Sequence, residues 1–232
     1  MERKIYLIVT AGGRGTRMGA TVPKQFLTLG GKPVLRLSIE KFIEALPGVK
    51  VITVLPKSHL QTWKEYCLNS SFTYPQTLVQ GGITRFHSVK NALAKVPDGA
   101  IVAVHDGVRP LLSQRMIRRM AAMMPDARAL IPVVPVTDTL KALDRDTSGL
   151  LHTIPGPSPD RSRIFAAQTP QMFLSEDLKA AYSRAFSTSF TDDASVAASA
   201  GIPLGWCDGE RLNIKITTPE DLRLAEAVLS LE

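Results

Sequence analysis

The chain has 232 residues, of which 44% are hydrophobic and 21% charged, values that are typical of a globular protein and exclude a disordered one. Its 28 Lys and Arg residues outnumber its 21 Asp and Glu residues, which gives a net charge of +7. The basic residues are scattered and only 6% of residues are aromatic. This pattern disfavours a nucleic-acid-binding protein, which needs a basic stripe or a stacking platform, and favours an anionic metabolite as the ligand.

Residues 1–10 carry charge and then a short apolar run, which predicts a buried strand rather than a signal peptide. No apolar run approaches the roughly 20 residues that a membrane-spanning helix requires. We therefore expect a cytoplasmic protein that binds no membrane. Cys67 and Cys207 lie far apart and fit no metal or redox spacing, so both are predicted to be free thiols.

Strand-like and helix-like segments alternate along the chain. The strand-like segments are short, apolar and rich in β-branched residues, and the helix-like ones repeat apolar residues at helical spacing. In chain order the sequence predicts strand 4–10, helix 33–46, strand 49–55, helix 84–96, strand 100–105, helix 113–124, strand 127–136 and helices 175–187 and 192–200. Such alternation predicts an α/β fold with a mainly parallel sheet and helices on both faces, within a single domain.

The last predicted helix, which starts at about residue 219, has the clearest N-terminal signals in the sequence. Thr218 is a natural N-cap, Pro219 suits the first helical position, and Glu220 and Asp221 suit the positive end of the helix dipole. By contrast, residues 136–163 contain short apolar runs that are divided by Asp, Gly, Ser and Pro. We interpret this segment as a hairpin-like arm that has a functional or interface role, the alternative being a surface loop.

The strongest local signal is the glycine-rich segment of residues 10–19 (TAGGRGTRMG), which directly follows the first predicted strand. Glycine lets the backbone turn sharply and bring N–H groups close to an anion, and Arg14, Arg17 and Lys24 add cations. The segment is neither a P-loop nor a dinucleotide fingerprint, because its residues and spacing differ from both. The alternative is a solvated glycine turn, but its place after a buried strand favours a triphosphate site.

Several segments resemble those of a known group of enzymes. Residues 11–18 and the run 23–26 (PKQF) are similar to the signature of sugar nucleotidyltransferases, which have a Rossmann-like α/β fold of the GT-A type. Segments that resemble the cytidylyltransferase branch follow in the same order: Gly81-Gly82 with Arg85 and Ser88, 105–110 (HDGVRP), 167–171 (AQTPQ), 191–194 (TDDA) and 213–217 (NIKIT). These matches span residue 5 to about residue 228 and most resemble the 2-C-methyl-D-erythritol 4-phosphate cytidylyltransferase family.

The resemblance implies transfer of CMP from CTP to 2-C-methyl-D-erythritol 4-phosphate, with release of pyrophosphate, in isoprenoid precursor biosynthesis. The attacking phosphate oxygen is already an anion, so catalysis depends on positioning and on stabilising negative charge rather than on a general base. The resemblance makes Arg17, Lys24 and Lys215 the catalytic cations. Lys215 is expected on a late strand, and without the resemblance it would be interpreted as a solvated edge-strand lysine.

Asp106 directly follows a predicted buried strand, a position that lies at the rim of ligand sites in α/β folds. Mg²⁺ takes one or two carboxylates together with substrate phosphates and waters, and the resemblance makes Asp106 its ligand. The alternative is a turn aspartate. Leu212 directly precedes the Asn-Ile-Lys motif, where the family sometimes has an acid, and Asp208 and Glu210 are the nearest acids. The second metal ligand is therefore left open.

The resemblance also implies which residues hold the two substrates. Ile83 stands where the family often has an acid, so we expect backbone groups to recognise the base and Arg85 to order the pocket. The expected nucleotide-binding residues are Ala11, Gly12, Gly13, Gly15, Gly82, Ser88, Asp106 and Gly107. The expected acceptor-binding residues are Thr139, Arg161 and Arg109. In the family the first two belong to the arm of a second subunit, which implies a homodimer with shared sites.

The sequence leaves two other functions open. Ribitol-5-phosphate cytidylyltransferases share the glycine-rich segment of residues 10–19, the His105-Asp106 motif and the lysine that corresponds to Lys215. Only the run 135–141 (PVTDTLK) favours the methylerythritol acceptor. A regulatory module that binds CTP without turnover is disfavoured, because Arg17, Lys24, Asp106 and Lys215 occur together.

Overall fold

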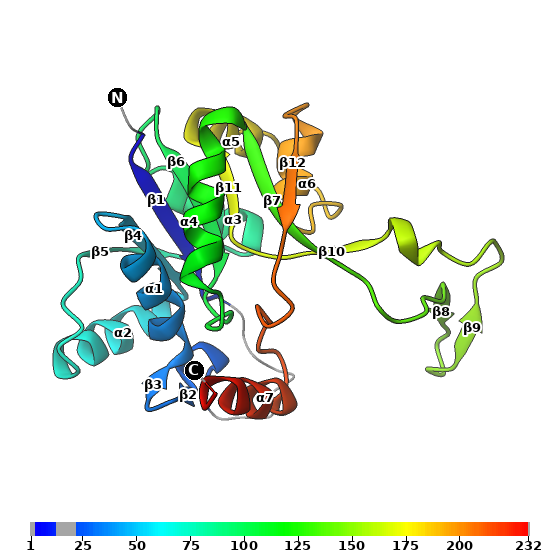
Figure 1. The fold of residues 1–232 in the computed structure, drawn as a ribbon, viewed down its shortest axis with the longest axis horizontal. Coiled ribbons are helices and arrows are strands. Elements are labelled where there is room, and N and C mark those ends of the chain that lie inside the picture. Colours follow the sequence, from blue (N-terminus) through cyan, green and yellow to red (C-terminus); the bar gives the residue numbers. More distant parts are fainter. Residues whose placement is uncertain (1–2, 13–21, 232) are drawn as a thin grey trace.

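The computed structural model describes residues 3–12 and 22–231, and within them eight strands form one central sheet (Figure 1). The spatial order is β10-β7-β11-β6-β1-β4-β5, with β12 beside β7. The strands are β1 Ile5–Thr10, β2 Thr28–Leu29, β3 Lys32–Pro33, β4 Lys50–Leu55, β5 Gln76–Gln80, β6 Ile101–Asp106, β7 Ala129–Pro135, β8 Leu143–Arg145, β9 Leu151–Thr153, β10 Phe165–Ala167, β11 Gln171–Leu174 and β12 Gly205–Asp208. The helices are η2 Lys24–Phe26, α1 Val34–Ala45, α2 Lys57–Asn69, α3 Arg85–Leu93, α4 Gln114–Met123, η3 Met124–Asp126, η4 Arg161–Arg163, α5 Ser175–Tyr182, α6 Asp193–Ser199 and α7 Pro219–Leu229.

Four parallel strands form one half of the sheet. Strand β1 pairs with β4 and β6, and β4 pairs with β5, all in parallel register. Strand β6 is buried along its whole length and β4 along all but its first residue, because both faces of the sheet are covered; this explains their continuous apolar sequences. On the other side, β11 runs antiparallel to β6 and β7, and β10 runs antiparallel to β7. The predicted α/β fold with a mainly parallel sheet is confirmed.

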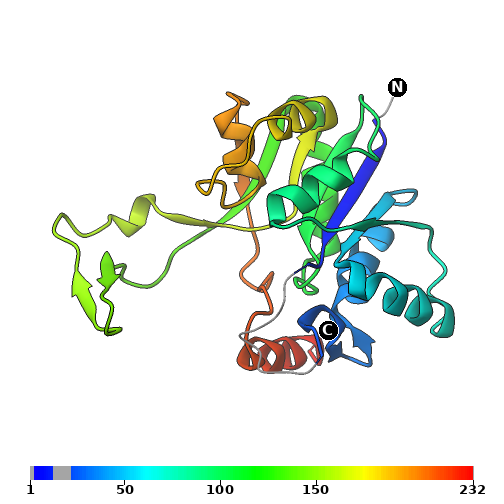
Figure 2. The ribbon, with the colours of Figure 1, turned by 180° about the vertical axis from the view of Figure 1, so that it is seen from behind.

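Helices cover both faces of this sheet, since neighbouring residues of a strand point to opposite faces. On one face, Leu7 and Val9 of β1 pack in a core with α1 and with Met116 and Met120 of α4. On the other face, Ile8 packs in a separate core with α3, α5 and α6. Figures 1 and 2 show the two faces in turn.

A third, smaller core lies against the C-terminal helix α7. Leu29 at the end of β2, Val108 after β6 and Ile216 before α7 are buried together in it. Gly30 has a φ of +53°, which favours glycine in the turn between β2 and β3, and a Cβ atom there would lie 2.5 Å from Cδ2 of Leu229 on α7. This core joins three segments that are far apart in the sequence and that each lead into the site described below.

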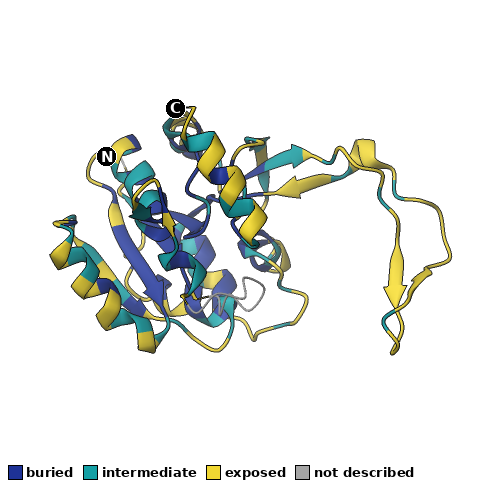
Figure 3. Cartoon of the chain, turned by 90° about the horizontal axis from the view of Figure 1, so that it is seen from below, coloured by how far each residue is buried: buried dark blue, intermediate teal, exposed yellow. Residues whose placement is uncertain are grey.

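Residues 136–163 form an arm that extends away from the sheet (Figure 1). The arm leaves the body after β7, forms an antiparallel hairpin of β8 and β9, and returns through η4 into β10. Most of its residues are exposed, in contrast with the buried central strands (Figure 3). The predicted hairpin-like arm is confirmed. Its exposed apolar side chains, a feature that favours contact with another molecule, are Leu143, Leu150, Leu151 and Ile154.

Both cysteines are free thiols, as predicted, and both are partly buried: Cys67 lies on α2 and Cys207 on β12. None of the described helices combines the length and the apolar character that crossing a bilayer requires.

Candidate active site

A pocket of about 900 Å³ lies at the carboxyl ends of the four parallel strands. Strand β1 ends at Thr10 and β6 at Asp106, and both residues line the pocket, as do residues of the loops after β4 and β5. Loops from several strands meet at this edge, which is where α/β folds bind ligands. The lining residues are Thr10, Ala11, Gly12, Pro23, Lys24, Gln25, Val54, Pro56, Lys57, Ser58, His59, Gly81, Gly82, Ile83, Thr84, Arg85, Ser88, Asp106, Val108 and Lys215.

The structure brings most of the predicted nucleotide-binding and catalytic residues to this pocket. Those that line it are Ala11, Gly12, Lys24, Gly82, Ser88, Asp106 and Lys215. Outside the described residues lie Gly13, Gly15 and Arg17, whose roles stay predictions. The predicted residues that do not line it are Gly107, Arg109, Thr139 and Arg161.

Asp106 is surrounded by cations. Its Oδ2 atom lies 3.0 Å from Nζ of Lys215 and 3.3 Å from Nε of Arg109, and its Oδ1 atom lies 3.9 Å from Nε of Arg85. Burial on its own would raise the pKa of this carboxyl, but the three cations outweigh burial and hold the pKa well below its usual range. Asp106 is therefore ionised, and the three cations leave an excess of positive charge around it that suits a polyphosphate.

Lys215 reaches the pocket from an extended segment between β12 and α7. The expectation of a strand here was wrong, because the segment pairs with loops rather than with a neighbouring strand. The N–H of Ile216 donates to the carbonyl of Val108 at 2.9 Å. The side chain of the fully buried Asn213 donates to the carbonyl of Thr169 at 2.9 Å. These two contacts on either side of the lysine fix its position beside the end of β6.

Lys24 enters the same pocket from the opening residue of η2. Two residues later, the ring of Phe26 packs edge-on against His59 at a centroid distance of 5.5 Å and lies 6.2 Å from Trp63. Trp63 is fully buried on α2. The lysine is thus carried by a short helix that is anchored to a neighbouring element, which limits its movement.

The turn between β5 and α3 is shaped by its own hydrogen bonds. The N–H of Gly82 donates to Oγ of Ser88 at 3.0 Å, and the Ser88 hydroxyl donates to the carbonyl of Thr84 at 2.9 Å. A Cβ atom at Gly82 would lie 2.4 Å from Cβ of His87, so this turn has no room for a side chain there. The side chain of Ile83 is 95% exposed. Backbone groups therefore remain the candidates for contact with a base.

Two predicted residues lie beside the pocket rather than in its lining. Gly107 packs against α1, where a Cβ atom would approach Leu35 to 2.8 Å. Arg109 donates to the carboxylate of Asp106 and, at 2.7 Å, to the carbonyl of Asn213. The position of Gly107 indicates a packing role. Arg109 links the end of β6 to the segment that contains Lys215.

The family model described as 2-C-methyl-D-erythritol 4-phosphate cytidylyltransferase matches residues 5–231. The chain belongs to this family. It is 44% identical over 223 residues to the 2-C-methyl-D-erythritol 4-phosphate cytidylyltransferase of Bacteroides thetaiotaomicron, a match that covers 96% of this chain and 98% of that protein. Its fold is similar to the solved 4-diphosphocytidyl-2C-methyl-D-erythritol synthase of Anaerococcus prevotii, with a TM-score of 0.77, 26% identity and coverage of 99% of this chain and 100% of that chain. It is also similar to the solved Francisella tularensis 2-C-methyl-D-erythritol 4-phosphate cytidylyltransferase, with a TM-score of 0.76, 29% identity and coverage of 97% and 99%.

In this member of the family, the two arm residues predicted to bind the acceptor lie away from the pocket of their own chain. Thr139 and Arg161 are both exposed, and neither lines the pocket. The guanidinium of Arg161 donates to the carbonyl of Thr137 at 2.8 Å, within the arm itself. The single chain therefore brings neither residue to its own pocket, whereas the family resemblance implies that they act in the pocket of another chain.

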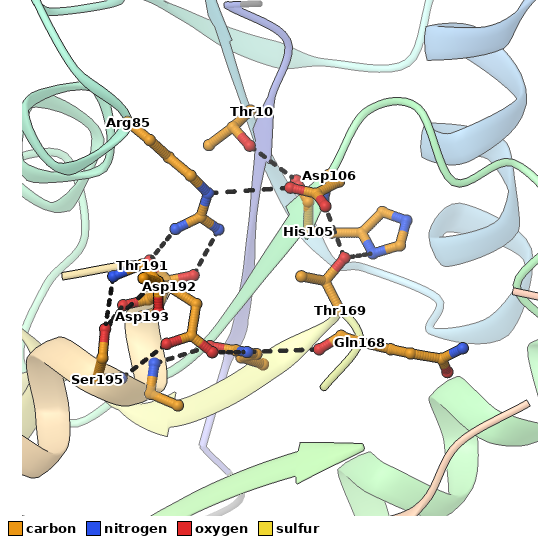
Figure 4. Close-up of polar contacts among 12 residues, drawn as sticks. Thr10, Arg85, His105, Asp106, Gln168, Thr169, Thr191, Asp192, Asp193 and Ser195 are labelled. Carbon is orange, nitrogen blue, oxygen red and sulfur yellow. Dashed lines mark hydrogen bonds and ion pairs between the residues drawn. The ribbon is translucent and has the colours of Figure 1, made fainter. Parts of the chain in front are cut away.

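A polar network behind Asp106 was not predicted from the sequence (Figure 4). Oγ1 of Thr169 accepts from the N–H of Asp106 at 3.1 Å and lies 3.0 Å from Nδ1 of His105. Burial lowers the pKa of His105 to about 4, so the imidazole is neutral at pH 7. Its Nε2 atom can then donate to the carbonyl of Arg109 at 3.2 Å. The sequence signal for Thr169 is its place in the motif 167–171, which by itself indicates no role for the hydroxyl.

Asp106 is also the candidate ligand for a divalent metal in this family member. Among the described residues, no group of three or more His, Cys, Asp and Glu side chains gathers in one place. Glu210 accepts from the N–H of Ser113 at 3.0 Å, and neither Glu210 nor Asp208 lines the pocket. One carboxylate in a pocket that can take a triphosphate fits Mg²⁺, which completes its coordination with phosphates and water. The residues do not fit a metal held by protein ligands alone.

Proposed function

We propose that the chain transfers CMP from CTP to 2-C-methyl-D-erythritol 4-phosphate, giving 4-diphosphocytidyl-2-C-methyl-D-erythritol and pyrophosphate, a step of isoprenoid precursor biosynthesis. Family membership over residues 5–231 supports this activity. Within the chain, the observation that carries the proposal is that Lys24, Asp106 and Lys215 line one pocket although they come from three distant motifs. A glycine turn with solvated lysines would give no reason for the three to meet.

The nucleotide is proposed to lie with its base at the turn that contains Gly82 and its phosphates towards Lys24 and Lys215. Gly81 and Gly82 line the pocket without side chains, so the backbone of this turn can approach the small cytosine ring closely. Ala11 and Gly12 at the end of β1 line the same pocket and are proposed to contact the nucleotide through their backbone. Gly13, Gly15 and Arg17 are proposed to complete the phosphate cradle.

The proposed chemistry needs no general base. An oxygen of the acceptor phosphate attacks the α-phosphorus of CTP, a new P–O bond forms, and the bond to the β-phosphate oxygen breaks with its electron pair leaving on pyrophosphate. Negative charge accumulates on the α-phosphate oxygens and on the leaving group. Lys24, Lys215 and Arg17 are proposed to stabilise this charge, and the contact between Lys215 and Asp106 holds that ammonium in place before the substrate arrives.

Mg²⁺ is proposed as the cofactor, with Asp106 as its protein ligand. When bound, the ion would neutralise part of the triphosphate charge and so favour departure of pyrophosphate. Lys215, Arg109 and Arg85 keep Asp106 ionised, which is the form that binds a cation. The protein residues in turn hold the nucleotide and orient the acceptor.

A homodimer with shared sites is proposed as the working form, located in the cytoplasm. Support comes from the arm: it extends from the body, carries exposed leucines and holds Thr139 and Arg161 away from the pocket of its own chain. Thr139 and Arg161 of one subunit are proposed to bind the acceptor in the pocket of the other. Arg109 is proposed to support that site electrostatically through its contact with Asp106.

The proposal is tested by measuring pyrophosphate release from CTP and Mg²⁺ with each of two acceptors. We expect release with 2-C-methyl-D-erythritol 4-phosphate and little with ribitol 5-phosphate. Release with ribitol 5-phosphate only would contradict the acceptor assignment. Binding of CTP without release in the presence of either acceptor would instead identify a CTP-binding module and would contradict the enzyme assignment.

A further inference from the structure

Arg85, at the start of α3, lies between two carboxylates (Figure 4). Its Nη1 and Nη2 atoms donate to Oδ1 and Oδ2 of Asp193 at 2.9 and 2.6 Å, so both ends of the guanidinium fork are engaged by one partner. Its Nε atom lies 3.9 Å from Oδ1 of Asp106. A two-bond fork of this kind fixes the plane of the guanidinium, and it therefore fixes which edge of Arg85 faces Asp106.

Asp193 is itself fixed more firmly than a surface carboxylate would be. Its side chain is fully buried and also accepts from the hydroxyl of Tyr182 on α5. It lies in the first turn of α6, where Asp192 caps the helix and shares a capping box with Ser195. A buried carboxylate is costly without a cation, so the pairing with Arg85 is the arrangement that burial of Asp193 demands.

The same helix start is tied to Asp106 by a second route. The side chain of Gln171 donates to Asp192 at 2.8 Å and accepts from the N–H of Ala194 at 2.8 Å. Gln171 begins β11, two residues after Thr169, whose hydroxyl accepts from the N–H of Asp106. The start of α6 is therefore linked to Asp106 by two routes: to its side chain through Arg85, and to its backbone through Gln171 and the neighbouring Thr169.

We propose that Asp193 is a positioning residue for CMP transfer: it holds Arg85 so that the guanidinium orients Asp106 and does not pair with the phosphates of the substrate. This inference rests on the proposed function. Arg85 lines the pocket, and an arginine without Asp193 would be drawn to the triphosphate or to both oxygens of Asp106. If Arg85 paired with both oxygens of Asp106, it would displace Lys215 from Oδ2 of Asp106 and so disturb a proposed catalytic cation.

Two substitutions at Asp193 separate positioning from packing. Asp193→Asn keeps the size of the side chain and removes its charge, whereas Asp193→Glu keeps the charge and adds a methylene group to a packed site. A packing role predicts that Asn is tolerated and Glu is harmful. The positioning role predicts the reverse order in kcat.

A matched control comes from a second Arg–Asp fork outside the pocket. Arg128 donates to Asp177 of α5 through Nε at 2.8 Å and also through Nη2. Neither residue lines the pocket, so Asp177→Asn should lower stability without a selective loss of kcat. The unfolding midpoint of each variant is measured by circular dichroism, so that every rate refers to folded protein.

The expected results for the full chain, assayed by pyrophosphate release, are a fall in kcat of about tenfold or more for Asp193→Asn, with KM for CTP changed by less than about threefold. Asp193→Glu should recover most of that loss. A kcat of Asp193→Asn within about twofold of the unchanged chain, or a lower kcat for Glu than for Asn, would overturn the inference.

Non-additivity gives a second criterion. If Asp193 acts through Arg85, then Asp193→Asn should lower kcat no further in a chain that already carries Arg85→Lys. An equal loss in both backgrounds would overturn the inference. Absence of pyrophosphate release by the unchanged chain would instead overturn the proposed function itself, so the two failures are distinct.

Discussion

Nζ of Lys215 lies 3.0 Å from Oδ2 of Asp106, which joins the segment before α7 to the end of β6. The lysine side chain is 42% exposed, so solvent screens its end of the pair, and the nearly buried Asp106 also contacts Arg109 and Arg85, so loss of Lys215 does not leave the carboxylate without a cation. The consequence of the pair is positional: an ammonium group is held at the carboxyl edge of the sheet beside the end of β1.

Lys24→Ala should lower kcat by a factor on the order of 10², because a cation aimed at charge that develops in the transition state is lost. The unfolding midpoint should stay close to that of the unchanged chain, since the packing of Phe26 against His59 and Trp63, which anchors η2, is retained. Steady-state pyrophosphate release and circular dichroism check both expectations. Lys50→Ala, at the exposed first residue of β4 and at the opposite edge of the sheet, is the control and should leave the rate unchanged.

Gly82→Ala should raise KM for CTP about tenfold or more, because a Cβ atom there lies 2.4 Å from Cβ of His87 and 3.0 Å from its carbonyl carbon. The turn must move, and the backbone groups proposed to meet the base move with it. A KM for CTP of Gly82→Ala within about twofold of the unchanged chain would show that the shape of the turn at Gly82 does not govern nucleotide binding.

The main fold was predictable from the sequence because its elements carry strong periodic signals. Strands β1, β4, β6 and β7 are continuous apolar runs, and α1 and α4 show clear helical spacing. The start of α7 was also predicted correctly: the side chain of Thr218 accepts from the N–H of Asp221, and Asp221 returns the bond in a capping box. Local chemistry and tertiary packing agree in these elements, which is why sequence reasoning works there.

Elements with weak periodicity were missed. In α2 only Trp63 is fully buried, and β5 is an edge strand with a single buried residue, so neither shows a full apolar stripe. The failure to predict α2 matters for the site, because Lys57, Ser58 and His59 at the start of α2 line the pocket. The predicted helix 175–187 ends early, at Tyr182, and the strand expected around Lys215 is absent within the described segment.

The charged residues of the site were predictable from motifs, but their mutual support was not. Asp106 and Lys215 were both chosen as candidates from the sequence. Their contact, and the bracing of Asp106 by Arg85 and Asp193, depend on which loops the sheet topology brings together. A single sequence carries no signal for a contact between residues so far apart in the chain.

The two cysteines should react slowly with a thiol reagent in the folded protein. Burial raises the pKa of both the Cys67 and the Cys207 thiol, so at pH 8 a smaller fraction is thiolate than in a free cysteine. The rate of reaction with Ellman's reagent should therefore be lower for the native chain than after unfolding in guanidinium chloride. Equal rates in the two states would contradict the burial of both side chains.

Subunit complementation tests the proposed sharing of the arm. A dimer of one Arg161→Ala subunit and one Lys215→Ala subunit should hold one intact site, built from Lys215 of the first and Arg161 of the second. Refolding the two variants together should restore about a quarter of the original activity, because half of the dimers are mixed and each has one intact site of two. Each variant refolded alone is the control. If the mixture is no more active than these controls, Arg161 does not act across subunits.

The most direct test of the whole account is kcat for pyrophosphate release by Lys215→Ala with CTP, Mg²⁺ and 2-C-methyl-D-erythritol 4-phosphate, with Lys179→Ala, which removes a surface pair with Asp98, as the control. The convergence of distant cations on one phosphorus predicts a loss in kcat on the order of 10²–10³ at an unchanged unfolding midpoint. A Lys215→Ala chain that releases pyrophosphate at the full rate would contradict it.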